Sequence, residues 1–283
     1  MSAGGGARAL SAAAVAIVLA SAALHAFWNT LIAEARDTHA ITAVALLTAA
    51  VVFAPVAALT WDVDGRAVPF IVASAALELA YFTLLAAAYA RADLSFVYPI
   101  ARGAAPVLVL AISGAFLGAA LSAGEVAGVL AVTAGVLLVR GVGAGAARQG
   151  LMLAIGVAAC IAGYTLVDDE GIRHAAALPY FEVVLVLTAL PYAAAVGLTR
   201  GSTALRTAVT WRAALVGLAM FGAYALTLAA LEIAEAAPVA ALRETSVVMA
   251  TAAAAVTARE HVPPRRLLGA VIVVAGIAAI ALA

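Results

Sequence analysis

The sequence predicts an all-α integral membrane protein with ten transmembrane helices, arranged as two inverted repeats of five helices each. Three observations lead to this fold class. The composition is too apolar for a water-soluble protein, ten apolar runs are long enough to cross a bilayer, and the second half of the chain repeats features of the first. Each observation also limits what the protein can do.

Composition places the chain in a membrane. Of its 283 residues, 67% are hydrophobic and 11% are charged, whereas a soluble globular protein is about 45–50% apolar and roughly 25% charged. The 15 basic residues, all arginine, balance the 15 acids. The net charge of zero therefore gives no sign of a nucleic-acid-binding surface. Cys160 is the only cysteine, and this argues against a disulfide framework or a metal cluster. The sequence therefore predicts no metal, no cofactor and no nucleic-acid partner.

Ten apolar runs follow one another along the chain, each close to the 20 or so residues that a membrane helix needs. Turn and charge signals separate them, most weakly at Gly118–Gly124. The first run is too long for the apolar part of a signal peptide and contains His25, Trp28 and Asn29, so we assign it to the first helix. The connectors are short and leave no soluble domain. The predicted spans are 9–33, 40–60, 67–90, 94–117, 122–139, 149–168, 177–199, 210–233, 237–258 and 264–283.

The two halves of the chain match when the sequence is offset by 141 residues. Arg102 then falls on Arg243, and two glycines of the fifth span fall on two glycines of the tenth. A looser match places Tyr81 over Tyr224. We therefore predict two repeats, residues 1–145 and 146–283. Because five is odd, the second repeat enters the membrane in the opposite orientation, and such inverted repeats typically enclose a substrate site near the midplane. This architecture predicts a transporter.

The arginines predict how the chain is oriented. We call the side with both termini side A and the opposite side B. Loops on side A hold three arginines and loops on side B hold ten. The positive-inside rule assigns the arginine-rich side to the cytoplasm, so both termini of this multi-pass inner-membrane protein are predicted to lie outside.

Two charged residues lie deep within consecutive predicted helices. Arg102 is about 12 Å from side B and Glu78 about 16 Å from side A, at 1.5 Å per residue. These depths nearly coincide, so we predict an Arg102–Glu78 ion pair, which either locks the two helices together or handles substrate and protons. Pro99 and Pro106 flank Arg102, and we expect the helix to be bent or locally unwound there.

The second repeat has two adjacent charges where the first repeat has one. Arg243 and Glu244 follow one another, so their side chains point about 100° apart on a helix and cannot pair well with each other. The position equivalent to Glu244 in the first repeat is Gly103. We predict that Arg243 holds an anionic group of a substrate, while Glu244 meets a cationic group or a proton.

Further polar and aromatic residues in the spans are candidates for the same site. His25 and Asn29 share one helix face, with Trp28 beside them. For single histidines and aromatics, a role in packing is at least as common as ligand binding. The predicted substrate-binding residues are His25, Trp28, Asn29, Glu78, Tyr81, Arg102, Tyr164, Asp168, Tyr224, Arg243 and Glu244, with Glu78, His25 and Glu244 as candidates for proton coupling.

Five strings of the sequence resemble the drug/metabolite transporter superfamily, specifically EamA-type carriers with ten helices and two EamA repeats. They are LHAFWN (24–29), ADLSFVYPIARGAAPVLVL (92–110), GYTLVDDEG (163–171), APVAALRETSVV (237–248) and the connector TAREHVPPRRLLGA (257–270). The connector of the first repeat, LGAALSAGE (117–125), lacks the acidic–basic pair usual in the family. The resemblance implies a central cavity and transport of small metabolites without ATP. It also implies termini that often lie inside, contrary to the arginine count.

The resulting prediction is a secondary transporter, with export favoured, of a small polar or amphipathic metabolite such as an amino-acid-like compound. It works by alternating access in the lipid bilayer, as a monomer or homodimer, with proton coupling and facilitated diffusion both open. One alternative is a lipid or undecaprenyl-phosphate flippase of the same fold. The other is an intramembrane enzyme acting on lipid-linked substrates, for which Asp168, Asp169 and Glu170 are the only acid cluster and lack suitable spacing. We therefore predict that the protein is not an enzyme.

The orientation can be tested with single cysteines at Ser2 and Ser202 in a Cys160→Ala background. We expect a membrane-impermeant maleimide to label the cysteine at position 2, and not that at position 202, in intact cells, because the arginine-rich loops stay in the cytoplasm. Labelling at position 202 alone would reverse the assignment.

Overall fold

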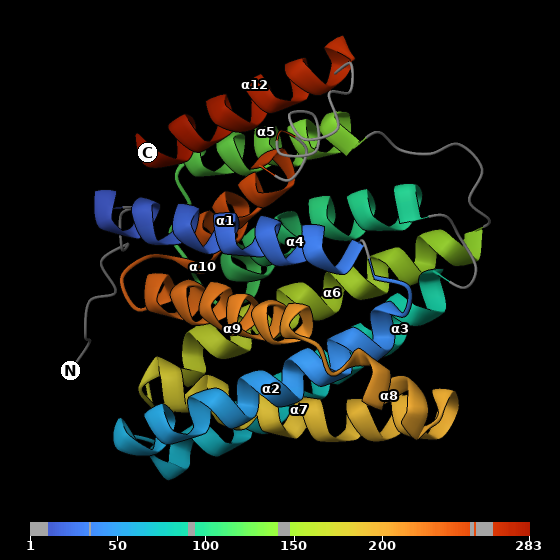
Figure 1. The fold of residues 1–283 in the computed structure, drawn as a ribbon. Coiled ribbons are helices and arrows are strands. Elements are labelled where there is room, and N and C mark those ends of the chain that lie inside the picture. The colour runs from blue at the N-terminus through green and yellow to red at the C-terminus, as the bar shows by residue number, and fades with distance from the viewer. Residues whose placement is uncertain (1–10, 34, 90–93, 141–147, 250–251, 253–262) are drawn as a thin grey trace.

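The protein is a bundle of membrane-length helices, as seen in a computed structural model (Figure 1). The structure describes residues 11–33, 35–89, 94–140, 148–249, 252 and 263–283. Among these residues, seven helices are long and apolar enough to cross a bilayer, and two shorter apolar helices cover Ile100–Phe116 and Ala123–Val139. The predicted fold class, an all-α integral membrane protein, is confirmed.

Nine of the ten predicted spans coincide with a single helix to within three residues at each end. A short 3-10 helix, η1 (Gly65–Ala67), and a seven-residue helix, α8 (Ser202–Ala208), were not predicted. Both lie in connectors, where brief turns carry little apolar pattern. The long helices are α1 (Ala12–Ala33), α2 (Thr38–Leu59), α3 (Val68–Tyr89), α4 (Leu94–Phe116), α5 (Ala123–Arg140), α6 (Arg148–Gly171), α7 (Ala177–Arg200), α9 (Trp211–Leu231) and α12 (Pro264–Ala281).

The ninth predicted span is interrupted. Helix α10 (Ala236–Arg243) ends at Arg243, Glu244 forms a turn, and residues 245–249 are helical again. The N–H of Glu244 donates to the carbonyl of Ala241 over 3.1 Å, and that of Val247 to the carbonyl of Glu244 over 3.0 Å. These tighter bonds mark a break in the α-helix. Most of the remainder of this span, and the start of the predicted connector 257–270, lie outside the described residues.

Helix α4 is continuous from Leu94 to Phe116, so the predicted local unwinding around Arg102 is wrong. A proline removes one hydrogen bond of the helical ladder, and the surrounding bonds keep α4 helical at Pro106. The broken helix belongs instead to the second half of the chain, at the position equivalent to Arg102–Gly103.

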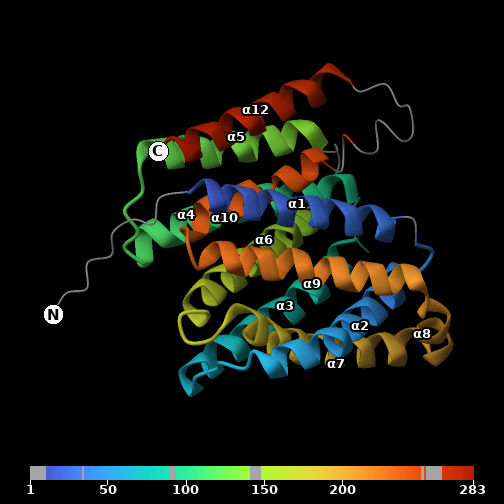
Figure 2. The same cartoon turned by 60° about the vertical axis from the view of Figure 1, so that its left-hand side comes forward.

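The helices form a stack with one helix pair at each edge. Helices α5 and α12 lie side by side at one edge, and α2 and α7 at the other (Figures 1 and 2). Between them, α1 packs on α9, and α6 packs on both α3 and α4. The start of α1 and the end of α12 lie at the same end of the bundle, which is side A (Figures 1 and 2).

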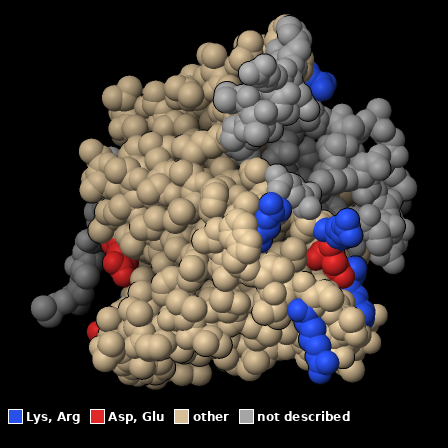
Figure 3. Space-filling view, in the orientation of Figure 1, with Lys and Arg blue, Asp and Glu red and all other residues tan. Residues whose placement is uncertain are grey.

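The arginines gather at the opposite end of the bundle, side B, next to α8 (Figure 3). This distribution follows the loop count made from the sequence. It does not reveal which side faces the cytoplasm, so the orientation stays a prediction. The arginines at this end whose side chains the structure describes are Arg36, Arg200, Arg206, Arg212, Arg265 and Arg266.

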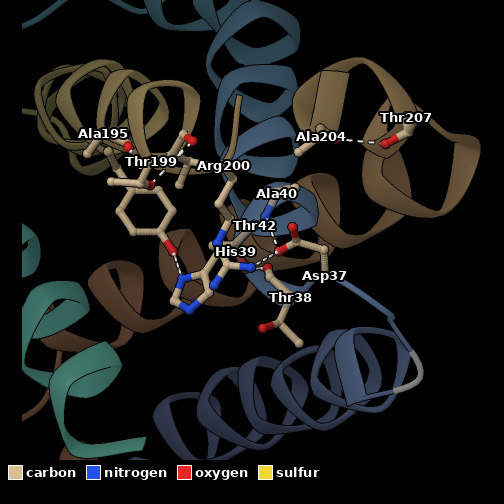
Figure 4. A network of polar contacts seen from close by, with 12 residues as sticks. Asp37, Thr38, His39, Ala40, Thr42, Ala195, Thr199, Arg200, Ala204 and Thr207 are labelled. Atoms are coloured by element: carbon tan, nitrogen blue, oxygen red, sulfur yellow. Dashed lines mark hydrogen bonds and ion pairs between the residues drawn. The ribbon is translucent and has the colours of Figure 1, made fainter. Parts of the chain in front are cut away.

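Helices α2 and α7 are fastened to each other at both ends. On side B, Arg200 donates to Asp37 over 3.1 Å, and the His39 ring lies 2.9 Å from the Tyr192 hydroxyl (Figure 4). On side A the backbones just beyond the two helices form a short antiparallel bridge. There the N–H of Asp64 donates to the carbonyl of His174 over 2.9 Å. An ion pair and a side-chain hydrogen bond hold one end of this helix pair, and backbone hydrogen bonds hold the other.

Small residues bring α5 and α12 into close contact. A Cβ added to Gly128 would lie 2.6 Å from the carbonyl oxygen of Gly276, and one added to Gly135 would lie 2.7 Å from that of Gly269. Such distances allow no side chain, so the two backbones touch at both crossings. Close approach of this kind drives helix association where lipid removes the hydrophobic driving force.

Replacing Gly276 with leucine should therefore destabilise the protein by about 1–3 kcal/mol or more, as overpacking does. Thermal unfolding in detergent measures the effect. The matched control is Gly65→Ala, because nothing lies within 4 Å of a Cβ at that position. Equal stability of the two variants would contradict close packing of α5 on α12.

Candidate functional site

A cavity of about 100 Å³ lies in the middle of the bundle. One water molecule needs roughly 10–15 Å³ measured in this way, so the cavity has room for a small ligand. Every long helix except α5 and α12 contributes to its wall, and so does α10. The lining residues are His25, Trp28, Leu46, Ala49, Glu78, Tyr81, Phe82, Arg102, Tyr164, Phe181, Leu185, Met220, Phe221, Ala223, Tyr224 and Arg243.

This cavity brings together most of the residues that the sequence predicted for a substrate site. Eight of the eleven line it, from both halves of the chain, while Asn29, Asp168 and Glu244 do not. Contact of any of them with a substrate stays a prediction. The eight are His25, Trp28, Glu78, Tyr81, Arg102, Tyr164, Tyr224 and Arg243.

The partner of Arg102 is Glu244. The Arg102 Nε donates to one carboxylate oxygen of Glu244 over 3.1 Å, and an Nη nitrogen lies 2.9 Å from the other. Both side chains are almost completely buried. The predicted Arg102–Glu78 pair is therefore wrong, because the depth of a residue along its helix does not reveal which helices are neighbours.

Arg243, the repeat equivalent of Arg102, is held in a different way. Its guanidinium carbon lies 5.2 Å from the centre of the Tyr224 ring, a cation–π contact. No carboxylate oxygen of a described residue lies within ion-pair distance of it. Of the two cavity arginines, Arg102 is thus neutralised by a carboxylate, and Arg243 presents a positive charge to the cavity.

Asp168 lies behind the cavity wall, completely buried. The hydroxyl of Tyr180 donates to one of its oxygens over 2.8 Å, and the hydroxyl of Tyr224 donates to the other. Asp168 therefore joins α6 to α7 and α9. Its neighbours Asp169 and Glu170 form ion pairs with Arg173 near the surface, at 3.6 and 3.3 Å.

Helix α1 contributes His25 and Trp28, whose rings meet edge to face with centroids 4.7 Å apart. The Trp28 indole N–H is buried and has no hydrogen-bond partner among the described residues, so the cavity wall carries an available donor. The Asn29 side-chain amide donates to the carbonyl of His25 over 2.8 Å, so this hydrogen bond stays within α1. On the same face, the Ser21 hydroxyl donates to the carbonyl of Ala223 over 2.6 Å and ties α1 to α9.

Aromatic rings form most of the apolar wall. The Phe181 ring centroid lies 5.0 Å from that of Phe221 and 4.7 Å from that of Tyr224, and the Tyr164 centroid lies 5.9 Å from that of Tyr224. Sequence reasoning missed Phe181, Phe221 and also Phe82. A phenylalanine in an apolar span does not reveal whether it faces lipid, a neighbouring helix or a cavity.

One buried acid was also missed. Glu182 on α7 is 5% exposed, and neither of its carboxylate oxygens has a hydrogen-bond partner within the part of the chain that the structure describes. It does not line the cavity. An acid six residues into an apolar span was the signal that could have pointed to it.

The architecture is shared with a protein of known structure, and part of the chain matches a known family. A protein of known crystal structure matches with a TM-score of 0.76 over 95% of this chain and 96% of its own, at 18% sequence identity. Identity this low establishes the fold alone. Residues 148–282 match the EamA-like transporter family. No curated protein matches the sequence.

The protein is thus a multi-pass membrane protein with a central cavity, as the resemblance implied, and its second half is similar to a transporter family. The family match lies on the half that supplies Tyr164, Phe181, Tyr224 and Arg243. The structural match extends over nearly the whole chain, so the cavity lies within the fold that the two proteins share. The substrate must be argued from the cavity itself.

Arg102 and Glu244 should behave as a coupled pair in this transporter. Arg102→Gln or Glu244→Gln alone leaves one buried charge without its partner, which typically costs about 3–5 kcal/mol. Combining the two changes should restore much of that loss in a thermal-stability cycle. Strictly additive losses would show that the pair does not contribute as a unit. Glu78→Gln combined with Arg102→Gln is the matched comparison and should not restore stability.

Proposed function

We propose that this EamA-like transporter carries a small amphipathic metabolite that has an anionic group, with amino-acid-like compounds as the favoured class. The observation that carries the proposal is the positive charge of Arg243 in an aromatic cavity. Arginine binds carboxylates through two parallel hydrogen bonds, and Arg102 is already engaged by Glu244. Arg243 is therefore the better partner for an incoming anion.

Other residues of the cavity wall suit the rest of such a molecule. Glu78 supplies a carboxylate for an ammonium group, and the rings of Tyr81, Phe82 and Phe181 supply an apolar wall. Aromatic side chains contribute large contact areas together with a polar edge. A zwitterion with an apolar side chain would match Arg243, Glu78 and the aromatic wall together. A purely apolar drug would leave the charges of Arg243 and Glu78 unmatched.

We further propose that the two halves form an inverted repeat that alternates access around this cavity. The packing supports this proposal, because the helices that close the two edges of the bundle are repeat equivalents. Helix α5 packs on α12, and α2 packs on α7. The contacts of Gly128 with Gly276 and of Gly135 with Gly269 are related in the same way. Two copies related by a twofold axis in the membrane plane make self-complementary contacts of this type.

Proton coupling, if present, falls to Glu78 and His25, because both line the cavity. Glu244 serves first as the counter-ion of Arg102. Its role toward a proton or a cationic group would require that the ion pair opens during transport. We therefore predict that Glu244→Gln lowers the stability of the protein.

Uptake and efflux in proteoliposomes, with a panel of amino acids and related amines and acids, tests the proposal with and without a pH gradient. Arg243→Gln should lower transport of the accepted substrate at least about tenfold, because a hydrogen bond to a charged group is worth roughly 1.5–3 kcal/mol. The matched control is Arg66→Gln, at an exposed arginine paired with Asp64 on side A. Transport by Arg243→Gln at the wild-type rate would refute the assignment of the anion site.

A further inference from the structure

Buried side chains line the part of the cavity that is nearer side A. Phe181 and Tyr224, which are 5% and 8% exposed, lie about 6 Å from the start of α7 and about 10 Å from the end of α9. Toward side B its wall includes His25 and Tyr81, both only partly buried. At 1.5 Å per residue, His25 and Tyr81 lie about 12 Å before the side-B ends of α1 and α3. Leu46 and Arg102, at a similar depth from side B, are 4% and 6% exposed. Buried side chains therefore cover the cavity toward side A.

Asp168 lies at the centre of that closed side. It precedes the side-A end of α6 by three residues, about 4.5 Å along the helix. The hydroxyl of Tyr180, three residues into α7, and the hydroxyl of Tyr224 on α9 donate to its two oxygens. Asp168 and Tyr180 are both completely buried. One carboxylate thus holds three helices together between the cavity and side A.

Gly171 makes room for this arrangement. A Cβ at this position would lie 2.5 Å from the Tyr180 hydroxyl oxygen and 2.6 Å from its Cζ atom. A larger residue would therefore displace the tyrosine from Asp168. The close fit also means that Tyr180 can be disturbed without removing any polar group.

Two neighbouring contacts extend the cluster of Asp168, Tyr180 and Tyr224, which we call the Asp168 clasp. Toward side A, the N–H of Ala176 donates to the carbonyl of Asp62 over 2.8 Å, beside the bridge that joins the ends of α2 and α7. Toward the cavity, the Arg243 guanidinium lies over the Tyr224 ring. Tyr224 therefore contacts both the cavity arginine and the carboxylate that holds the closed side.

We propose that the Asp168 clasp is the gate that closes the cavity toward side A, and that Asp168 acts as a positioning residue instead of a substrate ligand. This inference rests on the proposed function only in taking the cavity to be the transport pathway. An anion bound at Arg243 would compete with the Tyr224 ring for the guanidinium. Substrate binding is then coupled to the gate through Tyr224.

Cysteine accessibility tests the gate without any substrate. The reporter is Met220→Cys in a Cys160→Ala background, because Met220 lines the cavity about 13 Å from the side-B start of α9. A second reporter, Ser202→Cys in the α7–α8 connector, identifies side B in cells and in inverted vesicles. With the clasp intact, an impermeant methanethiosulfonate reagent should modify the cavity cysteine from side B only.

Tyr180→Phe combined with Tyr224→Phe removes both hydrogen bonds to Asp168 and keeps both rings. Each bond to a carboxylate is worth at least a factor of about ten in an equilibrium, so side-A modification should rise about a hundredfold. The matched control is Tyr192→Phe, which removes a hydroxyl from the same helix at side B. It should leave side A closed. If the double variant does not fold, Gly171→Ala takes its place, because it displaces Tyr180 from Asp168 without removing a polar group.

Three results would overturn the proposal. They are rapid side-A modification with the clasp intact, an unchanged side-A rate in a folded variant without the clasp, and equal opening by Tyr192→Phe. A transporter that gates as described but accepts no compound of the amino-acid panel would refute the proposed substrate class and leave the gate standing.

Discussion

The buried ion pair between Arg102 and Glu244 determines how the rest of the site is arranged. Both groups lie in an apolar bundle, where an isolated charge is strongly unfavourable, so neither is tolerated without the other. Arg102 belongs to a continuous helix of the first half, and Glu244 to the helix break of the second half. The pair therefore fixes the two halves to each other beside the cavity.

The same pair makes two equivalent arginines chemically different. Gly103 occupies the place of Glu244 in the first half, so only the second half supplies a carboxylate at this position, and it binds Arg102. Arg243 is left over the Tyr224 ring with its charge directed to the cavity. In the proposed inverted repeat, this one residue breaks the symmetry of the site.

Packing without a hydrophobic driving force explains the remaining organisation. Glycines allow α5 and α12 to touch at one edge of the bundle, while an ion pair and hydrogen bonds fasten α2 to α7 at the other. Helices α1, α3, α6, α7 and α9 carry the larger aromatic side chains that line the cavity, and these cannot pack as closely. A cavity lined by aromatic rings results at the centre, where the polar groups of both halves meet.

The sequence by itself determined the membrane class, nine of the ten predicted helices and half of the residues around the cavity. These features follow from apolar length and from polar residues inside apolar runs, which are local properties. Only the tertiary structure decided that Arg102 binds Glu244, that Glu78 does not bind Arg102, and that Asp168 holds two tyrosines behind the cavity wall. Each of these contacts depends on which helices are neighbours and which faces meet. That information is shared among distant segments, so the depth of a residue within its own helix cannot supply it.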